Sequence, residues 1–164
     1  MAIKNFSVIS LALIANFLMS PLSLADRVDD EVDTVLNLSK KPDGVVFEIV
    51  SSRRDLLQRA IPRVNQYVKK LRARFAGLDV AVVTHGREQF ALQKRYQQDN
   101  KKVHDAVERL SKDENVPVHI CQTFAAWNGV DPEDFPTYVT VSATGPQQIR
   151  DYEDLGYIKI VITR

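Results

Sequence analysis

Apolar residues fall in this chain either in short continuous runs or at the spacing of a helix. The runs are bounded by turn-forming residues, and continuous apolar runs of this kind are typical of parallel strands that are buried on both faces. The pattern therefore predicts strands over residues 45–50, 78–84, 116–121, 138–142 and 157–162.

Between these runs, apolar residues recur every three or four positions, which predicts helices. The longest extends from Leu57 to Phe75, where Ser51 and Ser52 are candidate caps and Pro62 indicates a kink or a late start. Further helical segments are expected over residues 32–38, 90–92, 103–110 and 146–154. Strands and helices alternate from residue 45 to the end, which predicts an α/β domain with a parallel or mostly parallel five-stranded sheet and helices on both faces. The order of the strands is left open by this pattern.

The first 25 residues have the pattern of a secretory signal peptide. Lys4 is the only charge before Asp26, residues 8–19 form an apolar core, and the small-x-small triplet Ser23-Leu24-Ala25 follows. We expect cleavage after Ala25, residence in the periplasm and no stable insertion in a membrane afterwards.

The alternative to cleavage is an uncleaved membrane anchor, because residues 5–25 carry no charge and are long enough to span a bilayer. Asn16, Pro21 and the short apolar core favour cleavage. The mature chain is then divided into a charged leader segment, residues 26–44, and one folded domain, residues 45–164.

The charges of the chain are balanced, with 22 Lys and Arg against 21 Asp and Glu. A sequence pI near 7.8 is not that of a dedicated nucleic-acid-binding protein. Residues 53–74 hold eight basic residues and one acid. We interpret this segment as a solvated helix face rather than a surface for an anionic partner, because the chain as a whole is neutral.

The carboxyl ends of the predicted strands carry small, polar or reactive residues. In open α/β sheets ligands bind beyond these ends, so Ser51-Ser52, residues 84–86, residues 121–123 and residues 142–145 are expected to share one crevice. Cys121 is the single cysteine of the chain, which excludes an intrachain disulfide. It lies where a strand gives way to a helical segment, whose backbone N–H groups favour a thiolate. Inert packing is the competing interpretation of a free cysteine.

Two histidines are candidates to stabilise the thiolate or to move its proton. His119 lies two residues before Cys121, so strand alternation places both on one face, and His85 ends the preceding strand. A metal site made by His85, His119 and Cys121 is a weaker alternative, because their spacing matches no standard motif. His104 is expected to be exposed, opposite the apolar stripe of its helix. No glycine-rich nucleotide fingerprint, serine nucleophile elbow or HExxH motif is present, so no cofactor is expected.

The segment VPVHICQTFAAWNGVDPEDFPTYVTVSATGPQQIRDYEDLGYIKI resembles the C-terminal half of the DsrE/DsrF-like family, and VVTHG at residues 82–86 resembles the end of that family's second strand. The resemblance covers residues 45–164. It implies a three-layer α/β/α domain that assembles into homo-oligomers, as trimers or hexamers. It also implies that Cys121 occupies the position at which sulfur-relay members hold a persulfide. His85 matches a position at the end of a strand where members of the family frequently have a histidine.

These observations lead to two functional hypotheses. The first is a periplasmic sulfur carrier or sulfurtransferase-like protein, in which Cys121 accepts sulfur from a donor and passes it to an acceptor protein or small sulfur compound, with His85 and His119 in the site. The second is a non-catalytic module of DsrE-like fold that binds a small ligand or serves only assembly, with Cys121 as buried packing.

Overall fold

Five strands form one sheet in the computed structural model, which describes residues 24–163. The strands are β1 (Gly44–Ile49), β2 (Asp79–Thr84), β3 (Val118–Cys121), β4 (Thr140–Ser142) and β5 (Tyr157–Ile162). Every pairing between them is parallel, and their order is β4-β3-β2-β1-β5. All five predicted strands are confirmed. β3 begins later than expected, because Pro117 has no N–H to donate to a sheet.

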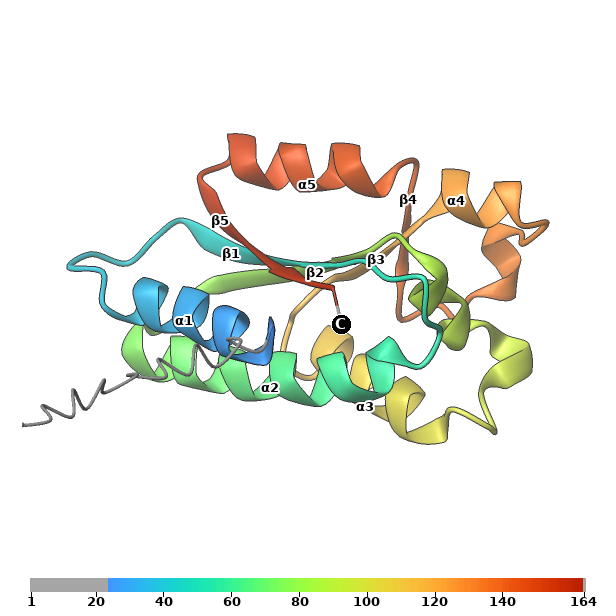
Figure 1. The fold of residues 1–164 in the computed structure, drawn as a ribbon, viewed down its shortest axis with the longest axis horizontal. Helices are drawn as coiled ribbons and strands as arrows, with labels where there is room; N and C mark the ends of the chain where they lie inside the picture. Colours follow the sequence, from blue (N-terminus) through green and yellow to red (C-terminus); the bar gives the residue numbers. More distant parts are fainter. Residues whose placement is uncertain (1–23, 164) are drawn as a thin grey trace, which may run out of the picture.

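Helices cover both faces of the sheet, which confirms the three-layer α/β/α architecture. The α-helices are α1 (Leu24–Leu36), α2 (Leu56–Arg74), α3 (Lys101–Lys112), α4 (Gln122–Trp127) and α5 (Gly145–Asp154). The short 3₁₀ helices are η1 (Arg87–Leu92), η2 (Lys94–Tyr96) and η3 (Pro132–Asp134). Helices α1, α2 and α3 lie on one face of the sheet, and α5 crosses the other face (Figure 1).

The start of α2 differs from the sequence-based expectation. The helix begins at Leu56 with Asp55 at its N-cap, so Ser51 and Ser52 do not cap it. Ser51 Oγ instead accepts a hydrogen bond from the Arg53 N–H at 3.1 Å, within the turn after β1. The helix does not start late at Pro62 either, because this exposed residue lies inside it.

The predicted leader segment, residues 26–44, contains most of α1, which is longer than the helix expected over residues 32–38. Val28, Val32 and Val35 of α1 are buried in the core. The Tyr67 hydroxyl on α2 also donates a hydrogen bond to Asp29 at 2.6 Å. This helix is therefore packed as part of the folded domain.

The predicted signal peptide lies outside the described residues except at its end, where the backbone of Leu24 and Ala25 opens α1. Within residues 24–163, the structure contains no helix with the length and apolar character needed to cross a membrane.

The two faces of the sheet are packed very differently. The main core lies between the sheet and α1–α3 and contains most of the buried apolar side chains. Under α5 the apolar cluster is small, with only Val46, Ala81, Val83 and Ile149 as its buried members. Polar side chains of the sheet share the space between α5 and the sheet with this cluster, and the candidate site lies among them.

His104 is buried, with 1% of its surface exposed, so the prediction of an exposed His104 is wrong. Its Nε2–H donates to the Ala91 carbonyl at 3.0 Å, and its Nδ1 contacts the Tyr138 hydroxyl. His104 follows Val103 directly, at the flank of the apolar stripe of α3. The segments that carry Ala91 and Tyr138 cover that flank, which the periodicity of one helix does not reveal.

Candidate functional site

The predicted site residues lie at the carboxyl edge of the sheet, where the register brings His85 and Cys121 together. Thr84 of β2 is paired with Ile120 of β3, so His85 and Cys121 occupy the next position on adjacent strands. Cys121 is in turn paired with Ser142 of β4. Neighbouring parallel strands are about 4.8 Å apart, so the three residues form a continuous row.

This row faces α5. Val118 and Ile120 of β3 belong to the main core on the opposite face, whereas His119 reaches Tyr152 of α5. Alternation along the strand therefore places Cys121 on the α5 face as well. His85 lies under the first turn of α5, because a Cβ at Gly145 would come within 2.3 Å of the His85 Cβ.

Cys121 is the N-cap of α4, the short helix that follows β3. Its Sγ accepts a hydrogen bond from the Phe124 N–H at 3.4 Å. A backbone donor directed at the sulfur stabilises a thiolate more than a thiol. The residue is nevertheless only 4% exposed, so a reagent needs a local opening to reach the sulfur.

The backbone of Cys121 is held by Gln89, a fully buried residue of η1. Gln89 Oε1 accepts a hydrogen bond from the Cys121 N–H at 2.8 Å, and Gln89 Nε2 donates to the Cys121 carbonyl at 3.2 Å. These two bonds satisfy both backbone polar groups at the end of β3 and fix the start of α4.

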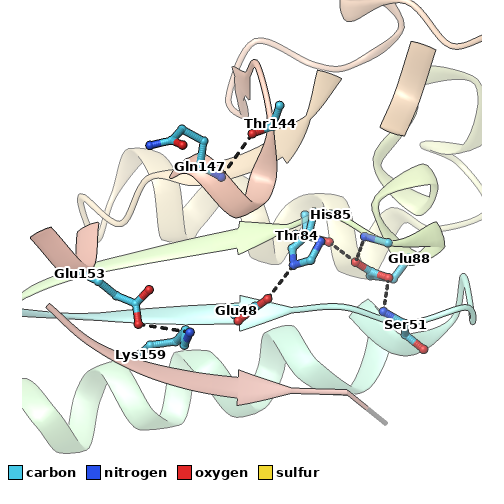
Figure 2. A network of polar contacts seen from close by, with 10 residues as sticks. Glu48, Ser51, Thr84, His85, Glu88, Thr144, Gln147, Glu153 and Lys159 are labelled. Carbon is cyan, nitrogen blue, oxygen red and sulfur yellow. Dashed lines mark hydrogen bonds and ion pairs between the residues drawn. The ribbon is translucent and has the colours of Figure 1, made fainter. Parts of the chain in front are cut away.

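Glu88, next to Gln89 in η1, ties the ends of β1 and β2 together. Its carboxylate accepts hydrogen bonds from the Ser51 N–H at 2.7 Å, the Gly86 N–H at 2.8 Å and the Thr84 hydroxyl at 2.6 Å (Figure 2). Sequence reasoning missed both Glu88 and Gln89. The available signal was a polar pair directly before the apolar residues 90–92, in a segment too short for a clear period.

His85 pairs with Glu48, a residue of β1 that sequence reasoning also missed. His85 Nε2 lies 2.8 Å from Glu48 Oε1, and the two side chains are only 15% and 17% exposed (Figure 2). The hydrogen bond from His85 lowers the pKa of the Glu48 carboxyl below its ordinary value, against the opposing effect of burial. Glu48 is the one charged residue in an otherwise apolar strand, which is the signal that could have identified it.

His119 lies in a hydrogen-bonded chain between β3, β4 and α5. The Ser142 hydroxyl donates its one proton to Gln148 Oε1 at 2.9 Å. Its oxygen therefore accepts a hydrogen bond from the Nδ1–H of His119, also at 2.9 Å. The remaining ring nitrogen, Nε2, then accepts from the Tyr152 hydroxyl at 2.8 Å. Burial lowers the pKa of His119 to about 4, so the ring is neutral at pH 7.

Neither histidine is hydrogen-bonded to the Cys121 sulfur within residues 24–163, where the only bond to Sγ comes from Phe124. His85, His119 and Cys121 also do not form a group suited to a metal ion. In the described part of the chain, no three His, Cys, Asp or Glu side chains meet that requirement. The geometry thus gives no support to the metal-site alternative.

Several of the basic residues between 53 and 74 make contacts within the domain. Arg53 pairs with Asp55, and the Arg72 guanidinium donates to the carbonyls of Leu78 and Glu114. These guanidinium groups are therefore engaged by neighbouring parts of the domain itself.

No protein-family model matches this chain, and a search of curated proteins gave no match either. Similar solved structures exist among proteins of unknown function. MTH1491 from Methanobacterium thermoautotrophicum has a TM-score of 0.58 at 20% identity, over 72% of this chain and 97% of that one. BT1422 from Bacteroides thetaiotaomicron has a TM-score of 0.53 at 12% identity, over 73% and 95%. At these identities the likeness concerns the fold alone.

Proposed function

We propose that this protein is a periplasmic sulfur carrier of DsrE-like fold that holds a persulfide on Cys121. The observation that carries the proposal is the setting of the sulfur. Cys121 Sγ accepts a hydrogen bond from the Phe124 N–H at the start of α4. The backbone N–H and carbonyl of Cys121 are both hydrogen-bonded to the Gln89 side chain. His85 occupies the adjacent register position, so an ionisable side chain lies at the same edge of the sheet as the thiol.

The chemistry required of this site is sulfane-sulfur exchange. The Cys121 thiolate attacks the outer sulfur of thiosulfate, a new S–S bond forms, and the old S–S bond breaks with its electron pair leaving on sulfite. An acceptor thiolate then attacks the outer sulfur of the Cys121 persulfide and restores the Cys121 thiolate. Each step exchanges one S–S bond for another, so no external oxidant or reductant is needed.

Access to the sulfur is expected through local opening of α4. This helix has six residues, of which only Ala125 is buried. A segment with few buried contacts opens at a smaller free-energy cost than global unfolding. A small donor can therefore reach Cys121 while the sheet and the larger helices stay folded.

The test is persulfide formation on the purified protein. Incubation with thiosulfate or inorganic polysulfide should add the mass of one sulfur atom in intact-mass spectrometry, and a reductant should remove it. Cys121→Ser is the matched control and should gain nothing. Absence of the adduct from the wild type, or an equal adduct on Cys121→Ser, would show that the proposal is wrong.

The burial of Cys121 favours a second candidate, the non-catalytic binding or assembly module. Trp127 and Leu155 are large apolar residues that are 78% and 65% exposed, and such side chains suit a contact between subunits of a homo-oligomer. A small thiol probe at neutral pH separates the two functions. Failure to label native protein that labels fully in urea favours the assembly module, and light scattering would give its trimeric or hexameric state.

A further inference from the structure

Glu48 is an unusual residue for its position in the sheet. β1 is an interior strand, paired with β2 on one side and β5 on the other, and its other side chains from Val45 to Ile49 are apolar and buried. A carboxylate that is 17% exposed in such a strand loses most of its hydration, a cost that a partner must offset. That partner is His85, which reaches Glu48 from the end of β2.

The chemistry of this pair fixes the tautomer of the histidine. His85 holds the pKa of Glu48 low, so the carboxyl is ionised at neutral pH and can only accept a hydrogen bond. The ring nitrogen that faces it, Nε2, must therefore carry a proton. In neutral His85 the lone pair is then on Nδ1, which has no hydrogen-bond partner among residues 24–163.

In the proposed function, the candidate to give a proton to Nδ1 of His85 is the Cys121 thiol. On the β3 side the next residue in register is Cys121, on the same face of the sheet. Above the ring lies the uncharged first turn of α5, at Gly145. The nearby Glu88 carboxylate accepts three hydrogen bonds of its own.

The remaining charges lie on the far side of Glu48. Lys159 of β5 attracts the Glu48 carboxylate and lies 3.1 Å from Glu153 of α5 (Figure 2). Of these two groups, Lys159 helps to keep Glu48 ionised. They leave His85 as the link between that carboxylate and Cys121.

We propose that Glu48 is a positioning residue that holds His85 as the Nε2–H tautomer, so that Nδ1 accepts the thiol proton of Cys121. This inference rests on the proposed function. The S–H bond of Cys121 breaks, its electron pair stays on sulfur, and the proton joins Nδ1, directly or through one water. The resulting imidazolium is stabilised by Glu48, and the thiolate is free to attack a sulfane-sulfur donor such as thiosulfate.

The tautomer is tested on the wild-type protein, without any substitution. Nitrogen-15 NMR of the histidine side chains at neutral pH should show His85 protonated on Nε2, and Glu48→Gln should weaken that preference. A wild-type His85 protonated mainly on Nδ1 would overturn the inference, whatever the variants do.

The consequence for Cys121 is tested by its alkylation rate with iodoacetamide as a function of pH. Glu48→Gln should slow the reaction at pH 7 by about tenfold, because the imidazolium that forms on accepting the thiol proton then has no carboxylate partner. His85→Gln should slow it similarly, and the double variant should be no slower than His85→Gln alone. Asp154→Asn, which removes an exposed carboxylate at the end of α5 opposite to His85, is the matched control and should leave the profile unchanged.

The outcomes separate this inference from the proposed function. If the wild type takes up sulfur from thiosulfate and Glu48→Gln, folded by circular dichroism, keeps the wild-type rate and pH profile, the role of Glu48 is wrong and the carrier stands. If the tautomer and the alkylation rates behave as expected but no persulfide forms, the coupling of Glu48, His85 and Cys121 is supported and the sulfur carrier is refuted.

Discussion

The side-chain amide of Gln89 binds Cys121 as a neighbouring strand would, with Oε1 on the backbone N–H at 2.8 Å and Nε2 on the carbonyl at 3.2 Å. All these atoms are buried. A residue of a 3₁₀ helix thereby takes the place of a sheet partner at the strand end where the candidate sulfur acceptor lies.

Replacement of Gln89 by Ala should destabilise the protein by about 2–4 kcal/mol, because two buried backbone groups lose their partners. Urea unfolding followed by circular dichroism measures the loss. Gln97→Ala, at an exposed position after η2, is the matched control and should change stability by less than about 0.5 kcal/mol. A Gln89→Ala variant as stable as this control would show that the two bonds contribute nothing.

Acid should destabilise the fold through His119. Burial lowers the pKa of His119 to about 4, from an ordinary value of 6.5 that applies to the unfolded chain. As the pH falls, the unfolded chain binds the proton first, so the stabilisation is complete above pH 6.5 and is lost between pH 6.5 and about 4. The loss from this one group should be about 2–3 kcal/mol.

His119→Gln isolates this contribution, because burial also lowers the pKa of His104 and adds a loss in the same direction. The stability gap between wild type and His119→Gln should shrink by about 2 kcal/mol between pH 7.5 and pH 4.5. Urea midpoints at the two pH values give the gap. A gap of constant size would mean that His119 does not titrate in this window.

The buried pair of His104 and Tyr138 provides a third prediction. His104 Nε2–H donates to the Ala91 carbonyl, so Nδ1 accepts from the Tyr138 hydroxyl. Tyr138→Phe leaves that buried nitrogen without a donor and should cost about 1–3 kcal/mol, measured by thermal unfolding. Tyr96→Phe, whose hydroxyl makes no hydrogen bond within residues 24–163, is the control, and an equal effect of both variants would contradict the prediction.

Gly145 is expected to tolerate no side chain. A Cβ there would lie 2.3 Å from the His85 Cβ and 2.9 Å from its Cγ, atoms that cannot swing away because they are next to the β2 backbone. Gly145→Ala should therefore push the start of α5 off the sheet and cost about 1–3 kcal/mol in the free energy of unfolding. Pro146→Ala, at the exposed next position, should cost less, and the reverse order would argue against close packing of α5 on His85.

The sequence by itself determined the elements and the class of the fold. Continuous apolar runs, separated by residues at helical spacing, were sufficient for five strands and the main helices, because burial on both faces leaves parallel strands no polar period. The same pattern placed Cys121 at the end of β3. The pattern did not give the exact start of α2. Ser51 and Ser52 are residue types suited to capping, but they lie in the turn before the helix and do not cap it.

The tertiary structure decided which residues share the site. The strand order and register place Cys121 between His85 and Ser142, and they let Glu48 of the neighbouring strand β1 reach His85. Residues 48, 85, 89 and 121 are separated along the chain, and no local period relates them. Such contacts arise only when the sheet assembles, since hydrogen-bond pairing between strands depends on topology whereas hydrophobic periodicity is a property of each segment alone.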